Sequence, residues 1–301
     1  MNKLRRSLLF IPGNNPGMIQ NAGVFDADGI IFDLEDAVSV DEKDAARDLV
    51  SYALQALDFT GNERVVRVNP LDTEWGQKDV EVISKALPDT ILIPKATEES
   101  IIKCHEILDR TEIDLGLALG TIRVIALIET AYGVERASEI VQSSTRVDGV
   151  LLGGEDFTAD MEIERTSKGQ ELFYARTRLS TLCRAYKLEF IDTPYADVND
   201  MTGFKEDLKE SIRIGATGKA AINPRQIEEI HNAFTPSRES VEWAERVVQA
   251  WAEAQAENKG VFSLQGKMVD APVVARAEKV LAKIKTLDLK GGSHYVESTG
   301  A

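Results

Sequence analysis

The feature of this sequence that most constrains its fold is a pattern that repeats eight times along the chain. Short aliphatic and β-branched runs alternate with longer stretches in which apolar residues recur at helical spacing. The starts of the short runs lie about 22 to 40 residues apart, which is the length of one strand–helix unit. The strand candidates begin near Ser7, Gly29, Glu63, Thr90, Arg123, Gly149, Glu189 and Gly218.

Several of the predicted strands are apolar on both faces. Residues 30–32, 91–93 and 124–128 are unbroken aliphatic or aromatic runs. Strands of this kind are typical of a parallel sheet that helices cover. Eight uninterrupted repeats predict an α/β protein with a closed (β/α)₈ TIM barrel, and a doubly wound open sheet is the alternative.

The pattern changes after the eighth unit. Residues 237–258 form one long amphipathic stretch, which a glycine-bounded segment from Gly260 to Gly266 ends before a further helix from Ala271 to about Lys285. We therefore expect a catalytic barrel domain at 1–235, a C-terminal helical arm or lid at 236–288 and a mobile tail at 289–301.

Composition excludes several classes of protein. The 301 residues carry a formal net charge of −15, which disfavours nucleic-acid binding because phosphate contacts need clustered lysine and arginine. No apolar run approaches the roughly 20 residues that span a bilayer, and the N-terminus lacks the long apolar stretch of a signal peptide, so we expect a cytoplasmic protein.

Cys183 lies on an apolar helical stripe and is interpreted as a core thiol. The histidines, which are His105, His231 and His294, have no metal-ligand spacing.

Polar residues follow the predicted strands at the end where barrel enzymes place their chemistry. Glu129 and Asp156 follow neighbouring strands, which lie about 4.8 Å apart. Two carboxylates this close repel unless a proton or cation lies between them, and Mg²⁺ uses one or two protein carboxylates with water and substrate oxygens. Glu35, Asp36 and Glu155 are predicted to accept hydrogen bonds from metal-bound water. The alternative is a pair of salt-bridged acids at helix N-termini.

Two cationic residues also follow predicted strands. Arg67 is a candidate partner for a substrate anion or for developing negative charge, although it could equally neutralise Glu35 or Asp36. Lys95 could form a Schiff base, but an ion pair with these acids is the favoured interpretation.

Six segments together resemble the superfamily of citrate lyase β subunits and malyl-CoA lyases, over about Leu4 to Lys285. They are residues 7–13, 32–38, 67–69, 128–130, 154–156 and 221–224. Within the superfamily the chain is most similar to the citrate lyase β subunits, on residues 71–76, 164–172 and 192–197. Malyl-CoA lyases also carry a longer insertion after the residue that corresponds to Asp156.

The resemblance implies a homotrimeric, Mg²⁺-dependent carbon–carbon lyase. Such an enzyme splits a citryl thioester, carried by an acyl carrier protein (γ) subunit or by CoA, into oxaloacetate and an acetyl thioester, beside an acyl-transferring α subunit. Carried over by position, Glu129 and Asp156 would hold Mg²⁺, and Arg67 together with Glu129 would bind substrate. Phe10 would contact the pantetheine or nucleotide arm, and Asp270 would be a catalytic acid or base inserted into a neighbouring subunit's site.

One departure from the malyl-CoA lyase pattern favours a carrier-bound substrate. Asn15 and Asn21 stand near positions where those enzymes have basic residues, which disfavours tight binding of free CoA. A stand-alone malyl-CoA or citramalyl-CoA lyase remains the first alternative, and a non-catalytic scaffold subunit is an alternative of another class. For Asp270, the alternative is that it only caps the helix that begins at Ala271.

Overall fold

The computed structural model describes residues 4–256 and 260–288, so the predicted tail at 289–301 and His294 lie outside the described residues. The chain divides into two compact units. One is Arg5–His231, and the other is the described part of Asn232–Ala301 together with Leu4. In the described part of the chain, no helix combines the length and apolar character that crossing a membrane would require.

The first unit is a closed barrel of eight parallel strands in sequence order, which confirms the predicted barrel and excludes the open sheet. Because β1 also pairs with β8, no strand of the barrel is left as an edge. The strands are β1 Ser7–Pro12, β2 Gly29–Asp33, β3 Glu63–Arg67, β4 Thr90–Ile93, β5 Arg123–Ile128, β6 Val147–Leu152, β7 Glu189–Asp192 and β8 Gly218–Ala221.

Only β6 begins away from its predicted start, at Val147 instead of Gly149. The sequence pattern hid its first two residues because Asp148 is a charged residue that strand propensity disfavours. In the structure Asp148 is paired with Arg5 at 2.8 Å and with Arg123 at 3.3 Å. These ion pairs stabilise a charge within the strand.

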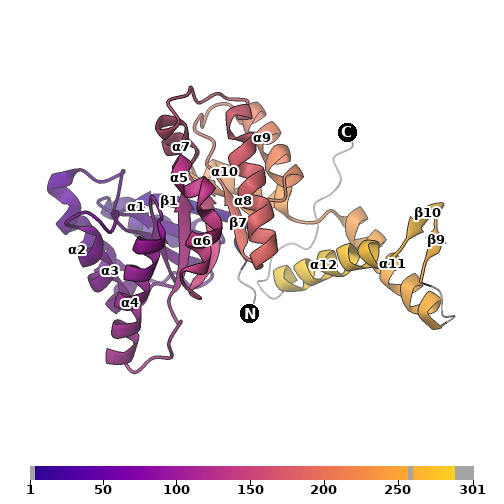
Figure 1. The fold of residues 1–301 in the computed structure, drawn as a ribbon, viewed down its shortest axis with the longest axis horizontal. Coiled ribbons are helices and arrows are strands. Elements are labelled where there is room, and N and C mark those ends of the chain that lie inside the picture. The colour runs from indigo at the N-terminus through magenta and orange to yellow at the C-terminus, as the bar shows by residue number, and fades with distance from the viewer. Residues whose placement is uncertain (1–3, 257–259, 289–301) are drawn as a thin grey trace. The chain divides into compact units, whose positions relative to one another are not determined.

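Helices follow the strands around the outside of the barrel, as the ribbon shows (Figure 1). The α-helices of this part are α1 Pro16–Asn21, α2 Lys43–Ala56, α3 Gly76–Ile83, α4 Glu98–Asp114, α5 Ala131–Glu135, α6 Ala137–Gln142, α7 Gly154–Asp160, α8 Phe173–Tyr186, α9 Met201–Arg213 and α10 Arg225–Phe234. Short 3₁₀ turns lie at Ala22–Val24, Val40–Glu42, Ser84–Ala86 and Gln170–Leu172.

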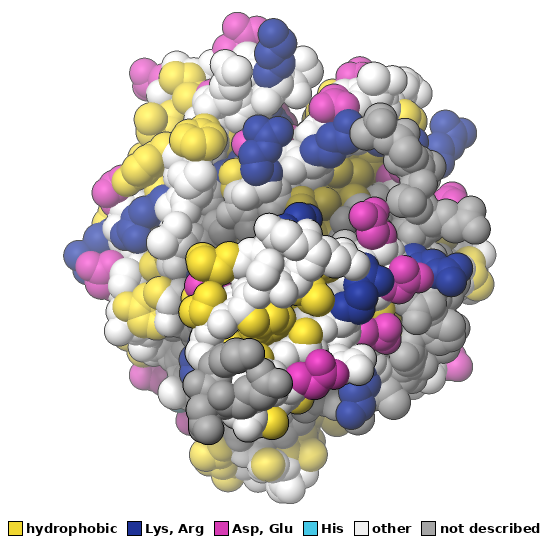
Figure 2. Space-filling model, turned by 90° about the vertical axis from the view of Figure 1, so that its right-hand side faces the viewer, with side chains coloured by type: hydrophobic (Ala, Val, Ile, Leu, Met, Phe, Trp, Pro, Cys, Tyr) yellow, Lys and Arg dark blue, Asp and Glu magenta, His cyan; other side chains and the backbone are white. Residues whose placement is uncertain are grey.

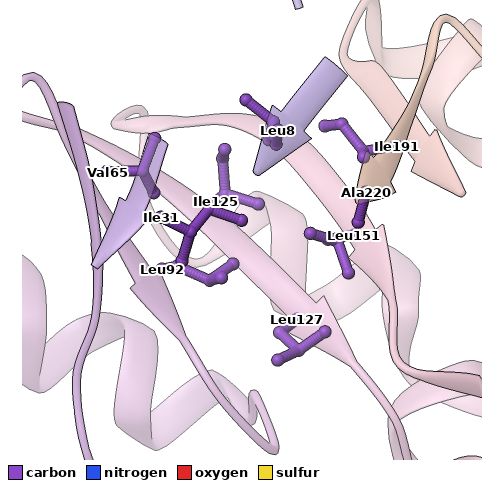
Figure 3. Packing of buried hydrophobic residues seen from close by; sticks show 9 residues of the cluster. All are labelled: Leu8, Ile31, Val65, Leu92, Ile125, Leu127, Leu151, Ile191 and Ala220. Carbon is purple, nitrogen blue, oxygen red and sulfur yellow. The ribbon is translucent and has the colours of Figure 1, made fainter. Parts of the chain in front are cut away.

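Aliphatic side chains from every strand fill the barrel interior (Figure 3). They form one buried cluster because alternate residues of each strand point inward, where eight strands leave room only for side chains. Its members are Leu8, Ile31, Val65, Leu92, Ile125, Leu127, Leu151, Ile191 and Ala220. The barrel is therefore a packed core, and any ligand must bind at its ends or outside it.

A buried ionic network lies at the β7–β8 side of the barrel. Lys219 Nζ lies 2.9 Å from Asp192 and 2.7 Å from Asp207, and Arg176 Nη2 contacts the same two acids at 2.9 and 2.7 Å. These four side chains are almost fully buried. Two cations and two anions balance in charge, which is the condition for charges to be tolerated inside a protein.

Cys183 on α8 is a buried free thiol, as the sequence predicts. Burial raises its pKa, which suits a core residue and disfavours a reactive one. The described histidines bond to serines: His231 lies 2.8 Å from Ser7 Oγ, and His105 lies 2.8 Å from Ser144 Oγ. Each of these two rings thus has one nitrogen engaged by a serine hydroxyl.

The second unit is a helical hairpin with a small two-stranded sheet. It contains α11 Arg238–Ala256, β9 Phe262–Leu264, β10 Lys267–Val269 and α12 Ala271–Asp288. Ala244, Val247, Val269, Val274 and Ala277 form its buried centre. Figure 2 shows acidic and basic side chains interspersed with exposed hydrophobic ones on one face of the molecule, without a dominant charge of either sign.

Candidate active site at the barrel mouth

A cavity of about 460 Å³ opens at the end of the barrel where the strands terminate. Parallel strands all end at the same rim, so residues distant in sequence meet there. Both predicted metal ligands, together with Phe10, Asp36, Arg67 and Glu155, line this cavity. Its other walls come from Pro12, Asp33, Ala37, Leu127, Leu151, Gly153, Gly154, Thr193, Pro194 and Ile222.

Glu129 lies directly after β5 and is only 1% exposed. Its Oε1 accepts a hydrogen bond of 2.7 Å from the backbone N–H of Lys95, whereas its Oε2 accepts none from any described residue. Burial, with the nearby charges of Glu35 and Asp156, raises the pKa of the Glu129 carboxyl to about 8. A cation beside Oε2 would reverse this effect, so the carboxylate is suited to hold one.

Gly153 leaves room for the Glu129 carboxylate. A Cβ at this position would lie 2.5 Å from Glu129 Oε2 and 2.6 Å from its Cβ. Next to it, the N–H of Gly154 donates to Thr193 Oγ1 at 2.9 Å, which fixes the turn into α7. The two glycines and Thr193 therefore fix the backbone at the end of β6, just before Asp156, the second predicted metal ligand.

Asp156 lies in the first turn of α7, with its side chain 38% exposed. Its nearest cation is Lys95 Nζ, at 4.0 Å. Among the described residues no group of three or more histidine, cysteine, aspartate and glutamate side chains is arranged to hold a metal. Glu129 and Asp156 fit Mg²⁺ nonetheless, because this hard cation needs few protein oxygens and takes the remainder from water and substrate.

Arg67, the last residue of β3, is held by three carboxylates. Its Nε and Nη2 each donate to Asp33 at 2.7 Å, and its Nη1 lies 3.0 Å from Glu35 and 3.1 Å from Asp36. Burial lowers the pKa of this guanidinium, but the bonds and charge of Asp33 raise it above its ordinary value. The ring of Phe10 lies under the guanidinium, 5.1 Å from Arg67 Cζ.

Asp33 is a site residue to which the sequence interpretation assigned no role. It pairs with Arg67 in the sheet register, so both side chains leave the barrel at the same level. The sequence places an acid and an arginine at the ends of neighbouring strands, and this pattern could have identified the pair. The two parallel N–H···O bonds make Asp33 the residue that orients Arg67.

Lys95 forms the ion pair that the sequence favoured over a Schiff-base role. Its Nζ lies 2.8 Å from Glu35 Oε1. Burial lowers the pKa of the ammonium, but the hydrogen bond and charge of Glu35 raise it above the ordinary value. The backbone of Lys95 is left-handed, with φ 44°, which is rare for a residue with a side chain and is typical of functional sites.

The three acids predicted to bind metal-bound water each have a cationic partner. Arg67 contacts Glu35 and Asp36, while Glu155 lies 3.2 Å from Arg165 Nε. Burial raises the pKa of Glu35, although Arg67 and Lys95 oppose this effect. These acids hold the cations of the mouth in place, and their contact with metal-bound water stays a prediction.

Asp270 belongs to the second unit and precedes α12. Its Oδ1 accepts the backbone N–H of Val273 at 3.2 Å, which is the capping contact of the alternative interpretation. Capping uses one carboxylate oxygen only, so it does not exclude a chemical role.

Asn15 and Asn21 form local hydrogen bonds at α1. The side-chain oxygen of Asn15 accepts from the Met18 N–H, and the side-chain amide of Asn21 donates to the Gly17 carbonyl.

The closed parallel barrel, with two carboxylates and an oriented arginine lining the cavity at its mouth, is the architecture of a TIM-barrel enzyme whose mouth suits a hard cation and an anionic ligand. The chain belongs to the HpcH/HpaI aldolase/citrate lyase family, whose model matches residues 6–224, and is a carbon–carbon lyase. Membership rests on the match over most of the barrel.

Three comparisons describe its similarity to known proteins. The chain is 42% identical to citrate lyase subunit beta of Leuconostoc mesenteroides subsp. cremoris, over 99% of this chain and 97% of that protein. It is 30% identical to human mitochondrial citramalyl-CoA lyase, over 92% and 84% of the two chains. The crystal structure of CitE from Mycobacterium tuberculosis with magnesium, acetoacetate and coenzyme A has a TM-score of 0.75 and 29% identity, over 92% and 97%.

Proposed function

We propose that this chain is the β subunit of a citrate lyase, which cleaves a citryl thioester on an acyl carrier protein into oxaloacetate and an acetyl thioester. The observation that carries the proposal is the 42% identity to a citrate lyase subunit beta over nearly both full lengths, against 30% to a citramalyl-CoA lyase. The α subunit, the acyl carrier γ subunit, a homotrimeric assembly and a cytoplasmic location belong to the same proposal.

Glu129 and Asp156 would hold Mg²⁺, which would supply a positive charge that polarises the hydroxyl and carboxylate oxygens of the substrate. Magnesium in the related CitE complex supports this assignment. The backbone N–H of Lys95 fixes one oxygen of Glu129, a residue that lines the cavity, and the other oxygen accepts no hydrogen bond from a described residue. The protein thus supplies a preformed carboxylate and needs little rearrangement on binding.

Arg67 would bind a carboxylate of the substrate. Asp33 and Glu35 are buried, but the Asp36 side chain is 56% exposed and contacts only Nη1 of Arg67. A substrate carboxylate can therefore replace Asp36 on Nη1 while Asp33 keeps the guanidinium oriented. This exchange leaves the number of charged contacts to Arg67 unchanged.

The cleavage itself is a retro-Claisen reaction. The tertiary hydroxyl releases its proton to solvent water, the carbon–carbon bond breaks to give oxaloacetate, and the electron pair of that bond passes to the acetyl thioester as an enolate. The enolate carbon then takes a proton, which Asp270 of a neighbouring subunit would deliver, and solvent would return a proton to Asp270 for the next turnover. Phe10, at the wall of the cavity, would contact the thioester arm.

The metal assignment is tested with Glu129→Gln and Asp156→Asn. Each variant should lose Mg²⁺ binding by calorimetry and nearly all cleavage of citryl carrier protein, with an unchanged circular dichroism spectrum. Full turnover of the wild-type protein after chelator treatment would exclude a required metal.

The choice of carrier is tested by comparing the KM for citryl-CoA with that for citryl carrier protein at fixed salt. Because Asn15 and Asn21 replace basic residues, the carrier-bound substrate should have the lower KM. Equal values would favour a stand-alone acyl-CoA lyase, the alternative that the 30% identity to citramalyl-CoA lyase supports.

The role of Asp270 is tested by mixing subunits. Loss of a helix cap costs about 1 kcal/mol of stability, whereas loss of an acid–base group costs on the order of 10² to 10⁴ in rate. Asp270→Asn and Glu129→Gln chains should each be inactive alone and should regain activity in mixed oligomers. No recovery, once subunit exchange is verified, would argue against action across a subunit boundary.

A further inference from the structure

A second and larger cavity of the barrel unit, about 770 Å³, lies outside the mouth. It is bounded by the turn before α8, by α8 itself and by α9. The turn belongs to residues 164–172, one of the segments that set this sequence apart within its superfamily. The function proposed above makes no use of this cavity.

A buried guanidinium reaches the wall of this cavity. Arg176 is 1% exposed, and its Nε and Nη2 donate to Asp192 at 3.0 and 2.9 Å, with a further bond of 2.7 Å from Nη2 to Asp207. Its Nη1 donates to none of the described residues, although Arg176 lines the cavity. Nη1 is not among the buried atoms that lack a partner, so it is open to the cavity and available to an acceptor there.

Gly169 keeps Nη1 accessible. This residue has a left-handed backbone, with φ 63°, and lines the same cavity. A Cβ added to it would lie 3.1 Å from Arg176 Nη1, 3.6 Å from Arg165 Nη1 and 3.7 Å from Asp207 Oδ1. A side chain at position 169 would therefore cover the free donor.

A second cationic residue precedes Gly169 in the same turn. Lys168 is exposed, lines the cavity and forms no ion pair with any residue in the described part of the chain. Among the acids that line the cavity, Glu206 pairs with Lys209 at 2.8 Å and Glu210 pairs with Arg213 at 3.0 Å, whereas Asp200 accepts hydrogen bonds from the Gly203 N–H and the Tyr195 hydroxyl. Asp207 is likewise engaged by Arg176 and Lys219.

We propose that Arg176 Nη1, Lys168 and the Gly169 turn form a binding site for one oxyanion, the phosphate or carboxylate group of a small ligand. A guanidinium edge and an ammonium are the donors that recognise such groups. Asp200, which pairs with no cation in the described part of the chain, restricts the ligand to a small anion, because a longer polyanion in this cavity would meet its charge. The site is independent of the barrel mouth and of the proposed function.

The proposal is tested by calorimetric titration of the full-length protein with inorganic phosphate and, separately, with malonate, at constant ionic strength. We expect saturable binding of one anion per chain, and the tighter of the two probes identifies whether the site prefers phosphate or carboxylate. Absence of saturable binding of both probes to the wild-type protein would overturn the proposal.

Two variants locate the binding without disturbing the buried network. Lys168→Gln should weaken binding about fivefold or more, and Gly169→Asn should weaken it at least as much, since asparagine tolerates a left-handed backbone and its side chain would cover Nη1. Lys187→Gln, at the other end of α8, is the matched control and should leave binding unchanged. Equal binding by the wild type and both variants would place the anion elsewhere, for instance on Arg67, and would refute the assignment.

Discussion

Replacing Gly153 with alanine is the sharpest test of how the mouth positions Glu129. Gly153 has φ −93° and ψ 91°, a conformation that alanine adopts without strain, so any effect of the change is steric. The new Cβ would lie 2.5 Å from Glu129 Oε2 and 2.6 Å from Glu129 Cβ. Separations below 3.0 Å essentially never occur for a real Cβ, so Glu129 must move.

The structure sets the size of the expected effect. Overpacking a close-packed region costs about 1 to 3 kcal/mol of stability. Moving Glu129 also stretches the 2.7 Å bond between its Oε1 and the N–H of Lys95. Loss of a contact that orients a metal ligand lowers metal affinity about 10- to 100-fold, and we expect Gly153→Ala to bind Mg²⁺ more weakly by this factor.

Calorimetric titration with Mg²⁺ and urea denaturation without metal measure the two effects separately. Gly17→Ala is the control, because the atom nearest to its added Cβ is Asn15 Oδ1 at 3.5 Å and the position lies in helix α1. That variant should keep wild-type Mg²⁺ affinity and equal or higher stability. If Gly153→Ala bound Mg²⁺ within twofold of the wild type and unfolded at the same urea concentration, the steric argument would be wrong.

Three further predictions concern burial. Lys219→Met leaves Asp192 and Asp207 without their ammonium and should cost about 3 to 5 kcal/mol in urea denaturation, whereas the exposed Lys209→Met should cost well under 1 kcal/mol. With a chelator present, the free energy of unfolding should fall as pH rises from about 4.5 to about 8, because folded Glu129 keeps a proton that the unfolded chain releases over this range. Glu129→Gln should weaken this pH dependence of stability. An unchanged dependence in the variant would count against the raised pKa of Glu129. Cys183 should react with a thiol reagent only after unfolding, and labelling of the native protein at the rate of a free thiol would contradict its burial.

The barrel could be predicted from the sequence because its signal is local and repeated. Strands such as Ile91–Ile93 are apolar on both faces, and their spacing leaves room for one helix each. The same periodicity placed Glu129 and Asp156 after neighbouring strands, and both line one cavity in the structure. Local sequence patterns were therefore enough to predict the fold and the end of the barrel at which the candidate site lies.

Contacts between distant residues could not be predicted in the same way. The β9–β10 hairpin has strands of three residues and turns at Gln265-Gly266, both left-handed, without the asparagine or aspartate that marks such a turn. Arg176 and Lys219 look like ordinary charged residues in sequence, and only the packing of α8 and α9 on the barrel brings them to the same two acids. Burial of a charge depends on tertiary structure, which no local pattern encodes.

Pairing of β1 with β8 has a consequence for synthesis on the ribosome. Leu8 and Leu9 of β1 pair with Ala220 and Ala221, which belong to the last strand of the barrel to be translated. At 5 to 20 residues per second, roughly 10 to 40 s pass between the emergence of the two strands. During this interval the open edge of β1 is exposed to other nascent chains, so we expect folding yield in the cell to depend on chaperones that shield it.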